Sequence, residues 1–341
     1  MAVLDWQTIG AFQRNFSRLQ GLGPGCRLLL GMMSHRIRYV PPGGSLCEVT
    51  HRCLQGRHLL KPSPRLNRLV TGILARAQRL TGAGVVGATV LSNHLHLLLR
   101  VDDARVLARF MNYVSSNLAR EASLLYDWHG KFWSGTYRAV LVADDEASQV
   151  ARLRYLIANA CKENLVARPE EWPGLHIATM IEDGPVLVGR WVDRTALCRA
   201  RRRLGGASLE ASDFEIDEML ELSPLPVWRQ LNGRAYRARV QELRRDVAEE
   251  TLARHSREGT RPLGRRKVLH QNPHRASPPP TKRPLPLLHT VSRAVRSAFT
   301  NAYRRIVKAF RAASIRLREG DRDVEFPPGT FPPGLAFVPH E

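Results

Sequence analysis

The sequence has few acidic residues for its size, and no long apolar segment. Its 341 residues include 31 Asp and Glu against 52 Lys and Arg, which gives a formal net charge of +21. Such an excess of positive charge predicts a polyanionic partner, nucleic acid first and an anionic membrane surface second. No apolar run reaches the roughly 20 residues that a membrane-spanning helix needs. The composition therefore favours nucleic acid as the partner, and we expect no membrane partner.

Cysteine is also scarce and follows no metal-binding pattern. The five Cys residues are odd in number, scattered, and without the spacing of a zinc ribbon. They are typical of reduced thiols in a cytosolic protein. The apolar residues 26–33 are too few, and lack a clean cleavage site, for a secretory signal peptide. We expect a cytoplasmic protein that is associated with the nucleoid through DNA.

Two histidines stand out in residues 85–101, which contain two short apolar strands with Ser92 and Asn93 as turn residues between them. His94 and His96 lie two residues apart on the second strand, so their side chains point to the same face. Two imidazoles on a rigid strand form half of a metal site. The plainer alternative is a pair of polar residues on a half-exposed strand, which is the usual meaning of an isolated His-x-His.

The elements predicted around this hairpin follow the order β-α-β-β-α-β-α. Apolar residues at helical spacing predict the helices, and apolar or alternating stretches predict the strands. An antiparallel sheet with helices packed on one face fits this order, as in a ferredoxin-like α+β domain. The predicted strands lie within residues 46–60, 85–101 and 137–142, and the predicted helices within residues 66–80, 104–125 and 146–163.

The last of these helices carries a second group of polar residues. On a helical wheel, its apolar residues form one stripe that must face the sheet. Tyr155, Asn159, Lys162 and Arg152 fall on the opposite side. A tyrosine on a polar helix face is usually a surface residue. Here it lies beside an amide oxygen, which can bind a hard cation, and beside two cations, which can hold phosphate. The group is suited to nucleophilic attack on a phosphodiester.

These two motifs together resemble those of a known family. His94-Leu95-His96 is similar to the histidine-hydrophobic-histidine signature of the HUH nucleases. RYLIANACKENLV, followed by ARPEEWPG, resembles the catalytic-helix region of the REP-associated tyrosine transposases, and Phe132-Trp133 also fits that family's pattern. Tyr155, Asn159 and Trp172-Pro173 occupy the family's motif positions. The resemblance covers about residues 35–180 and departs at Ala160, where the family often has proline.

The resemblance implies a transposase that cleaves and rejoins single-stranded or hairpin DNA. A divalent ion, Mg²⁺ or Mn²⁺, would be held by His94, His96 and the side-chain oxygen of Asn159. Tyr155 would attack the phosphorus and form a 5′-phosphotyrosine link, which a free 3′-hydroxyl can reverse. The missing G-x-x-x-x-G-K-[ST] motif argues against a replication initiator linked to a helicase. The DNA sequence recognised, the mobility of the element and homodimer formation are left open.

Basic residues outside the two motifs are expected to bind the DNA backbone. Arg152 and Lys162 flank Tyr155, and Arg36 and Arg38 open the domain. Arg304 and Arg305 lie in a predicted basic amphipathic helix, for which we favour a DNA contact over a solvated face.

The predicted organisation has five parts: an N-terminal extension, residues 1–34, with Met32 or Met33 as an alternative translation start; the transposase domain, 35–180; a helical accessory region, 181–254; a basic Pro-rich linker, 255–286; and a basic helix with an extended tail, 287–341.

Two other classes of protein remain as alternatives. A non-catalytic DNA- or RNA-binding module would keep the fold and the charge but form no covalent link to DNA. An unrelated metal hydrolase would use His94 and His96 with a water nucleophile and leave Tyr155 without a role. Covalent attachment of DNA separates the first alternative from the transposase, and cleavage by Tyr155→Phe would favour the second.

Overall fold

A computed structural model describes residues 37–203, 209–278 and 285–333 of the chain. The chain divides into two compact units, Met1–Arg38 and Tyr39–Glu341. The predicted N-terminal extension, residues 1–34, lies outside the described residues, as does Arg36. Everything described below belongs to the second unit, unless Ile37 or Arg38 is named.

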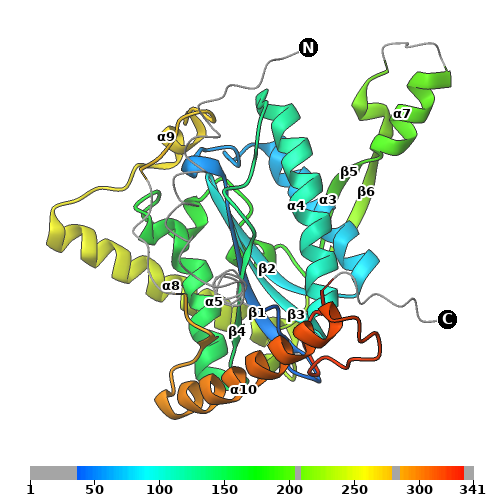
Figure 1. The fold of residues 1–341 in the computed structure, drawn as a ribbon. Coiled ribbons are helices and arrows are strands. Elements are labelled where there is room, and N and C mark those ends of the chain that lie inside the picture. Colours follow the sequence, from blue (N-terminus) through cyan, green and yellow to red (C-terminus); the bar gives the residue numbers. More distant parts are fainter. Residues whose placement is uncertain (1–36, 204–208, 279–284, 334–341) are drawn as a thin grey trace, which may run out of the picture. The chain divides into compact units, whose positions relative to one another are not determined.

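The central element is a five-stranded sheet in the order β2-β3-β1-β4-β7 (Figure 1). The pairs β1–β3, β1–β4 and β2–β3 are antiparallel, and β7 adds to the edge parallel to β4. The first four strands and the helices between them have the order and pairing of a ferredoxin-like domain, so the predicted α+β class is confirmed. The strands are β1 (Ser45–Arg52), β2 (Gly84–Leu91), β3 (His94–Val101), β4 (Arg138–Val142) and β7 (Leu288–His289).

One face of the sheet is covered by α3 (Pro64–Thr81) and α4 (Ala104–Tyr126), which lie to the right of the sheet in Figure 1. Their apolar stripes predict this packing, and the large buried side chains Ile73 and Phe110 fill it. Leu95, Leu97 and Leu99 of β3 point into the same core. The alternation of the strand therefore sends His94 and His96 to the opposite face.

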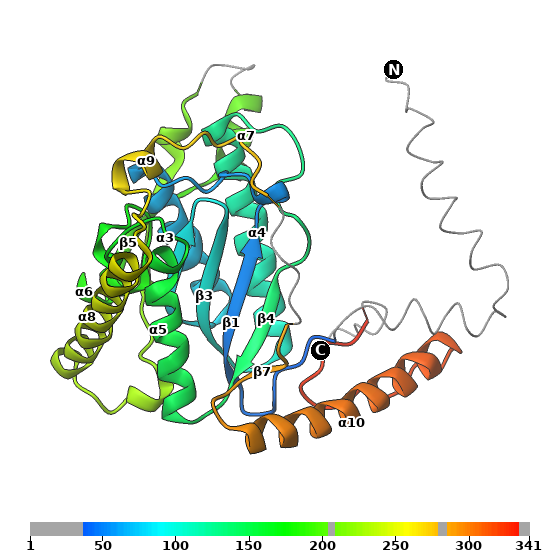
Figure 2. The ribbon, with the colours of Figure 1, turned by 90° about the vertical axis from the view of Figure 1, so that its left-hand side faces the viewer.

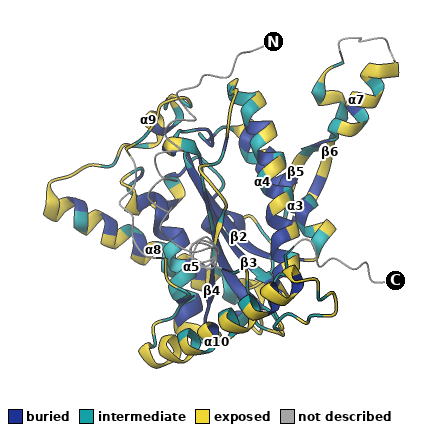
Figure 3. Cartoon of the chain, in the orientation of Figure 1, coloured by how far each residue is buried: buried dark blue, intermediate teal, exposed yellow. Residues whose placement is uncertain are grey.

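A helix also covers the opposite face of the sheet, whereas the sequence predicted helices on one face only. Helix α5 (Glu146–Lys162) packs its Leu153, Leu156 and Ile157 against Leu46, Leu98 and Val142 of the sheet. Asp145 caps its first turn by accepting a hydrogen bond from the backbone N–H of Ser148, as an acidic start predicts. In Figure 3, the strands are largely buried, whereas the outer sides of the C-terminal helices are exposed.

A further layer, α8 (Gly233–Glu258), covers α5 on the side away from the sheet. Val240 and Val247 of α8 join the core that α5 shares with the sheet. Helix α5 is thus packed from two directions. The other described helices are α6 (Ile177–Glu182), α7 (Arg194–Arg203), α9 (Arg265–Leu269) and α10 (Arg293–Arg318), with short 3₁₀ turns at Leu54–Gly56, Pro169–Glu171, Ala211–Phe214 and Pro226–Trp228.

The region after residue 180 differs from the predicted helical accessory region. It contains a two-stranded antiparallel ribbon, β5 (Val186–Val192) and β6 (Glu215–Glu221). The ribbon crosses α3 so closely that a Cβ on Gly189 would lie 2.0 Å from the backbone nitrogen of Gly72. Glycine on both elements permits this approach. The ribbon is therefore packed tightly against the ferredoxin-like core.

The segment predicted as a linker and tail is also part of the packed structure. Val268 of α9 is fully buried in the core around α5. Strand β7 adds a fifth strand at the edge of the sheet beside β4, and Thr330 forms a β-bridge with Tyr39. Figure 2 shows α10 running across the end of the sheet where β1 begins. Within the described ranges, no helix combines the length and apolar character needed to cross a bilayer.

His176 ties α5 to the element that follows it. The ring is fully buried, its Nδ1 accepts from the backbone N–H of Ala178 at 3.3 Å, and its Nε2–H donates to the carbonyl of Ile157 at 3.1 Å. Burial lowers the pKa of His176 to about 4, although the bond to Ile157 acts in the opposite direction. The ring of His176 is therefore neutral in the folded protein at neutral pH.

This burial predicts a pH-dependent loss of stability. An unfolded histidine takes up its proton near pH 6.5, whereas native His176 does so near pH 4, so the unfolded state binds more protons in between. The free energy of unfolding should therefore fall as the pH is lowered from 6.5 towards 4, with roughly 3 kcal/mol from this residue. Urea unfolding at several pH values should show a shallower decline in His176→Gln. Parallel curves for the two proteins would contradict the assignment.

Candidate active site

The centre of the candidate site is Glu48, whose carboxylate is buried in the middle of β1 with 5% of the side chain exposed. Its Oε1 accepts a hydrogen bond from Nδ1 of His96 at 3.0 Å. Its Oε2 lies 3.2 Å from a guanidinium nitrogen of Arg152 and 2.9 Å from Nε2 of His289. Burial alone would raise the pKa of Glu48, but the hydrogen bonds from His289 and His96 hold it well below its usual range. The carboxylate is therefore ionised and joins β1 to β3, α5 and β7.

Strand register brings Glu48 to the same face as the two histidines. Directly opposite pairs in the β1–β3 ladder are Thr50 with His96 and Arg52 with His94. Glu48, Thr50 and Arg52 alternate along β1 and therefore share one face. Thr50 Oγ1 also lies 3.2 Å from Nδ1 of His96. One face of two neighbouring strands thus carries a carboxylate, a hydroxyl, a guanidinium and two imidazoles.

The two imidazoles are held with the same ring nitrogen bonded to the protein. His94 donates from Nδ1 to Oδ1 of Asn93 at 2.6 Å, and His96 donates from Nδ1 to Glu48. The ring centroids are 5.0 Å apart. Burial, with His96 and Arg52 nearby, lowers the pKa of His94 well below its ordinary value, so its ring is neutral. When Nδ1 carries the proton, the lone pair of a neutral ring lies on Nε2. There it can bind a metal ion or accept a hydrogen bond.

Tyr155 lies on α5 beside this histidine pair. Its ring centroid is 5.8 Å from that of His96. Arg152 and Lys162 each place their charge 4.6 Å from the centre of the Tyr155 ring. The structure thus brings together the tyrosine, both cations and the histidines that the sequence analysis predicted as a site.

The resting ionisation of Tyr155 is set more by burial and by Glu48 than by the two cations. Burial raises its pKa, the negative charge of Glu48 raises it further, and Arg152 lowers it by less. The phenol is therefore protonated at neutral pH in the resting protein. Burial also lowers the pKa of Lys162, with help from Arg152, Arg154 and Arg254. The basic side chains of Arg152 and Lys162 thus lie close together around a neutral phenol.

Asn159 is one helical turn beyond Tyr155, on the same side of α5. The helical wheel predicted a polar face turned away from the sheet, yet Asn159 is only 2% exposed. Its Nδ2 is buried without a hydrogen-bond partner among the described residues. A buried donor without a partner costs about 1–3 kcal/mol, so an incoming acceptor, such as a phosphate oxygen, would supply the hydrogen bond that this N–H group lacks.

These residues also fit a divalent ion chemically. No group of three His, Cys, Asp or Glu side chains among the described residues is arranged to hold a metal. The third protein ligand would have to be of another type, and the side-chain oxygen of Asn159 is a candidate. Two imidazoles with one amide oxygen leave coordination positions open for substrate oxygens, and Nδ1–H bonds of the kind seen here orient metal-binding histidines.

The remaining residues that the sequence predicted belong to other parts of the chain. Arg38 is exposed and belongs to the first compact unit. Arg304 and Arg305 are exposed on α10 and contact none of the side chains around Glu48 that are described above. Trp172 is 3% exposed and donates from Nε1 to the carbonyl of Val90 at 3.0 Å, so it stabilises the sheet edge next to α5.

Sequence reasoning missed Glu48 and His289. An acidic residue in the middle of the apolar stretch 45–52 was a usable signal, because its alternation places it on a buried face. No comparable signal marked His289, which reaches the site from a two-residue strand after a basic, Pro-rich stretch. Its pairing with β4 depends on long-range contact rather than on a local pattern.

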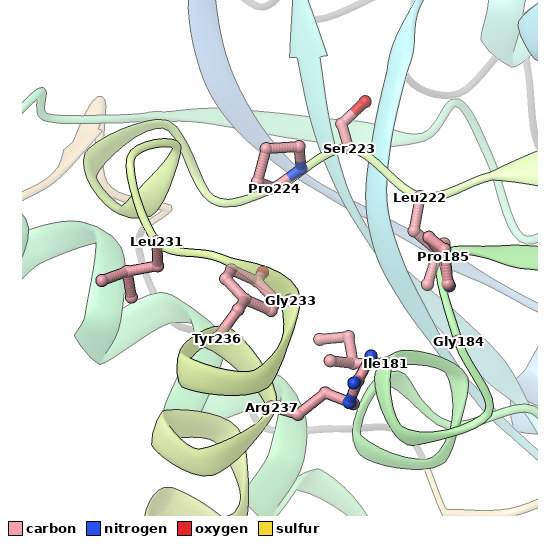
Figure 4. Close-up of a pocket in the computed structure, with 10 residues that line it drawn as sticks. All are labelled: Ile181, Gly184, Pro185, Leu222, Ser223, Pro224, Leu231, Gly233, Tyr236 and Arg237. Carbon is pink, nitrogen blue, oxygen red and sulfur yellow. The ribbon is translucent and has the colours of Figure 1, made fainter.

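A cavity of about 190 Å³ lies elsewhere, between α6, the ends of β5 and β6, and α8 (Figure 4). Ile181, Leu222 and Leu231 line it together with Arg237 and Tyr236. The hydroxyl of Tyr236 accepts from the backbone N–H of Leu225 at 3.2 Å, and burial raises its pKa to about 12. This tyrosine is therefore a structural group, and the cavity is no rival to the cluster around Tyr155.

The comparisons with known proteins give partial likenesses. No family model and no curated protein matches the chain. Among solved structures, it is similar to a REP-associated tyrosine transposase bound to a REP hairpin, with 15% identity over 42% of this chain and 81% of that one, and a TM-score of 0.35. It is also similar to a protein of Deinococcus radiodurans R1 that is provisionally described as a transposase, with 18% identity over 35% of this chain and 94% of that one, and a TM-score of 0.26. With TM-scores below 0.5, neither likeness identifies what this chain does.

The role of Glu48 can be tested through stability. In Glu48→Gln the amide keeps the shape, but it loses the charge and presents a donor to partners that are themselves donors. Removing the charge from a buried pair usually costs about 3–5 kcal/mol, and we expect a loss of this order in the free energy of unfolding. Urea unfolding measures it. Glu242→Gln, at an exposed position of α8, is the control and should change stability by less than about 0.5 kcal/mol. Equal small effects in both variants would refute the central position of Glu48.

Proposed function

We propose that the protein is a transposase that cleaves and rejoins single-stranded or hairpin DNA, with Tyr155 as the nucleophile. The observation that carries the proposal is the placement of the Tyr155 ring next to His96 with Arg152 and Lys162 against it. A tyrosine whose ring is flanked by two cations and an imidazole is unusual for a surface residue. It suits a group that must approach a phosphodiester.

In the proposed reaction, the phenol oxygen of Tyr155 attacks the phosphorus of the DNA backbone. The phenol loses its proton, the new bond joins the tyrosine oxygen to phosphorus, and the bond from phosphorus to the 3′ oxygen breaks. The 3′ oxygen leaves with a proton, and the 5′ end stays attached as a phosphotyrosine. Attack by a 3′-hydroxyl on this link reverses the step and can join a different strand.

The chain's own residues supply binding and charge. Arg152 and Lys162 hold the anionic phosphate, and their charge stabilises the negative charge that grows on the attacked group. Because the resting phenol is protonated, this stabilisation matters most as the proton leaves. Glu48 holds Arg152 and His96 in place through its two oxygens.

His94, His96 and Asn159 are the residues that would hold Mg²⁺ or Mn²⁺. When bound, such an ion would polarise the phosphate and favour departure of the 3′ oxygen. The neutral ring of His94, the protein bonds at both Nδ1 atoms and the position of Asn159 one helical turn beyond Tyr155 support this assignment.

Removal of one oxygen tests the nucleophile. Tyr155→Phe keeps the ring against Arg152 and Lys162, so it should fold and bind DNA as the wild type does. It should form no covalent adduct with labelled single-stranded hairpin DNA in Mn²⁺, as judged by a denaturing gel. Tyr113→Phe removes a hydroxyl from α4, on the other face of the sheet, and is the control; its adduct should form normally. An adduct in Tyr155→Phe would overturn the assignment, and cleavage without an adduct would favour a water nucleophile.

The metal ligands can be tested by binding alone. His94→Ala, His96→Ala and Asn159→Ala should each weaken Mn²⁺ binding by at least about tenfold, measured by electron paramagnetic resonance of free Mn²⁺. DNA affinity should change little, because it comes mainly from phosphate neutralisation by Lys and Arg. His129→Ala, whose ring is almost fully exposed, is the control. Unchanged Mn²⁺ binding in His96→Ala would show that the metal site is wrongly placed.

A further inference from the structure

We propose that the exposed face of α7 binds the phosphate backbone of double-stranded DNA, as a second contact separate from the Tyr155 site. Helix α7 is carried between β5 and β6, outside the ferredoxin-like core. The proposal rests on the proposed function in one respect only, namely that the polyanionic partner is DNA. It does not depend on the chemistry of Tyr155.

The base of α7 is held firmly in place. Leu197 is 3% exposed, and Arg194 forms a two-point contact with Glu121 of α4, with Nε 2.8 Å from Oε1. The ribbon below it is fixed by the close packing of Gly189 on Gly72. A ligand that meets α7 therefore meets a preformed surface, and little ordering is needed on binding.

The charge of α7 is largely uncompensated. Its ten residues, RTALCRARRR, include five arginines and no acidic residue, and Glu121 neutralises only Arg194. Arg199, Arg202 and Arg203 are exposed and form no ion pair with any described residue. The spacing of three and four residues places them on one face. Like charges at this spacing destabilise a helix, although their place in the last turn suits its dipole, so an anionic partner would relieve the repulsion.

The chemistry of this face fits a duplex better than a single strand. Proteins that hold single strands stack the bases on aromatic side chains, and α7 has none. Arginine binds phosphate through its forked donors, and duplex DNA offers the higher density of phosphates. In Figure 1, α7 lies on the side of the sheet that α3 and α4 cover, opposite to the face of Tyr155, and Arg194 ties it to α4. A contact at α7 is therefore separate from the Tyr155 site.

The test measures binding of a 20-base-pair duplex in the Tyr155→Phe background, in which no covalent step is possible. Arg199, Arg202 and Arg203 are replaced together by glutamine. We expect the slope of log K against log salt to become shallower by about 2 to 3 units, since each lost duplex contact removes about 0.9. The matched control replaces Arg234, Arg239 and Arg245, three exposed arginines of α8, and so removes the same net charge. Its slope should change by less than one unit.

The outcomes separate this proposal from the proposed function. An unchanged slope in the α7 variant, or an equal change in the α8 control, would overturn the duplex contact. A loss confined to single-stranded oligonucleotides, with duplex binding unaffected, would also overturn it. The same three α7 substitutions in the wild-type background should still form the Tyr155 adduct on a short single strand. Absence of that adduct in the wild type itself would refute the tyrosine chemistry and leave the result for α7 intact.

Discussion

A single buried carboxylate organises the candidate site. A charge in the interior is tolerated only when donors surround it, and Glu48 draws its donors from three different elements: His96 of β3, Arg152 of α5 and His289 of β7. Each of these elements is thereby fixed relative to β1. The position of Arg152 in turn fixes the Tyr155 ring, which lies against its guanidinium. The geometry around the tyrosine thus follows from satisfying one negative charge.

The same carboxylate sets the electrostatics of the resting site. Burial and the charge of Glu48 both raise the pKa of Tyr155, so the phenol is neutral in the resting protein. Arg152 is shared between Glu48 and the face of the tyrosine ring, and Lys162, whose pKa is lowered by burial and by its arginine neighbours, is short of negative partners. A phosphodiester brings the negative charge that these two cations lack. Binding of the substrate and stabilisation of the charge on it are therefore properties of the same residues.

The sequence predicted the parts of this arrangement that local periodicity encodes. Alternation along β3 placed His94 and His96 on one face, and the spacing of α5 placed Asn159 beside Tyr155. The burial of Asn159 was not predictable in this way, because a helical wheel assumes that one side faces solvent, whereas α5 is packed between the sheet and α8. The ribbon β5–β6 was missed because β6 is rich in acidic residues, while the mostly apolar β5 exposes Val186 and Val188, so neither strand shows a clear apolar alternation.

The C-terminal third shows why composition alone misjudged that region. Its arginines and prolines are typical of a linker, yet a few short contacts are enough to attach it to the core. Val268 fills a place beside α5, the backbone N–H of Ser277 donates to the carbonyl of Gln55 at 3.0 Å, and β7 pairs with β4. Because β7 carries His289 to Glu48, the charge balance of the site includes a residue from the far end of the chain. A chain that ended at residue 254 would leave one side of Glu48 without its donor, so the site and the C-terminal segment have to fold together.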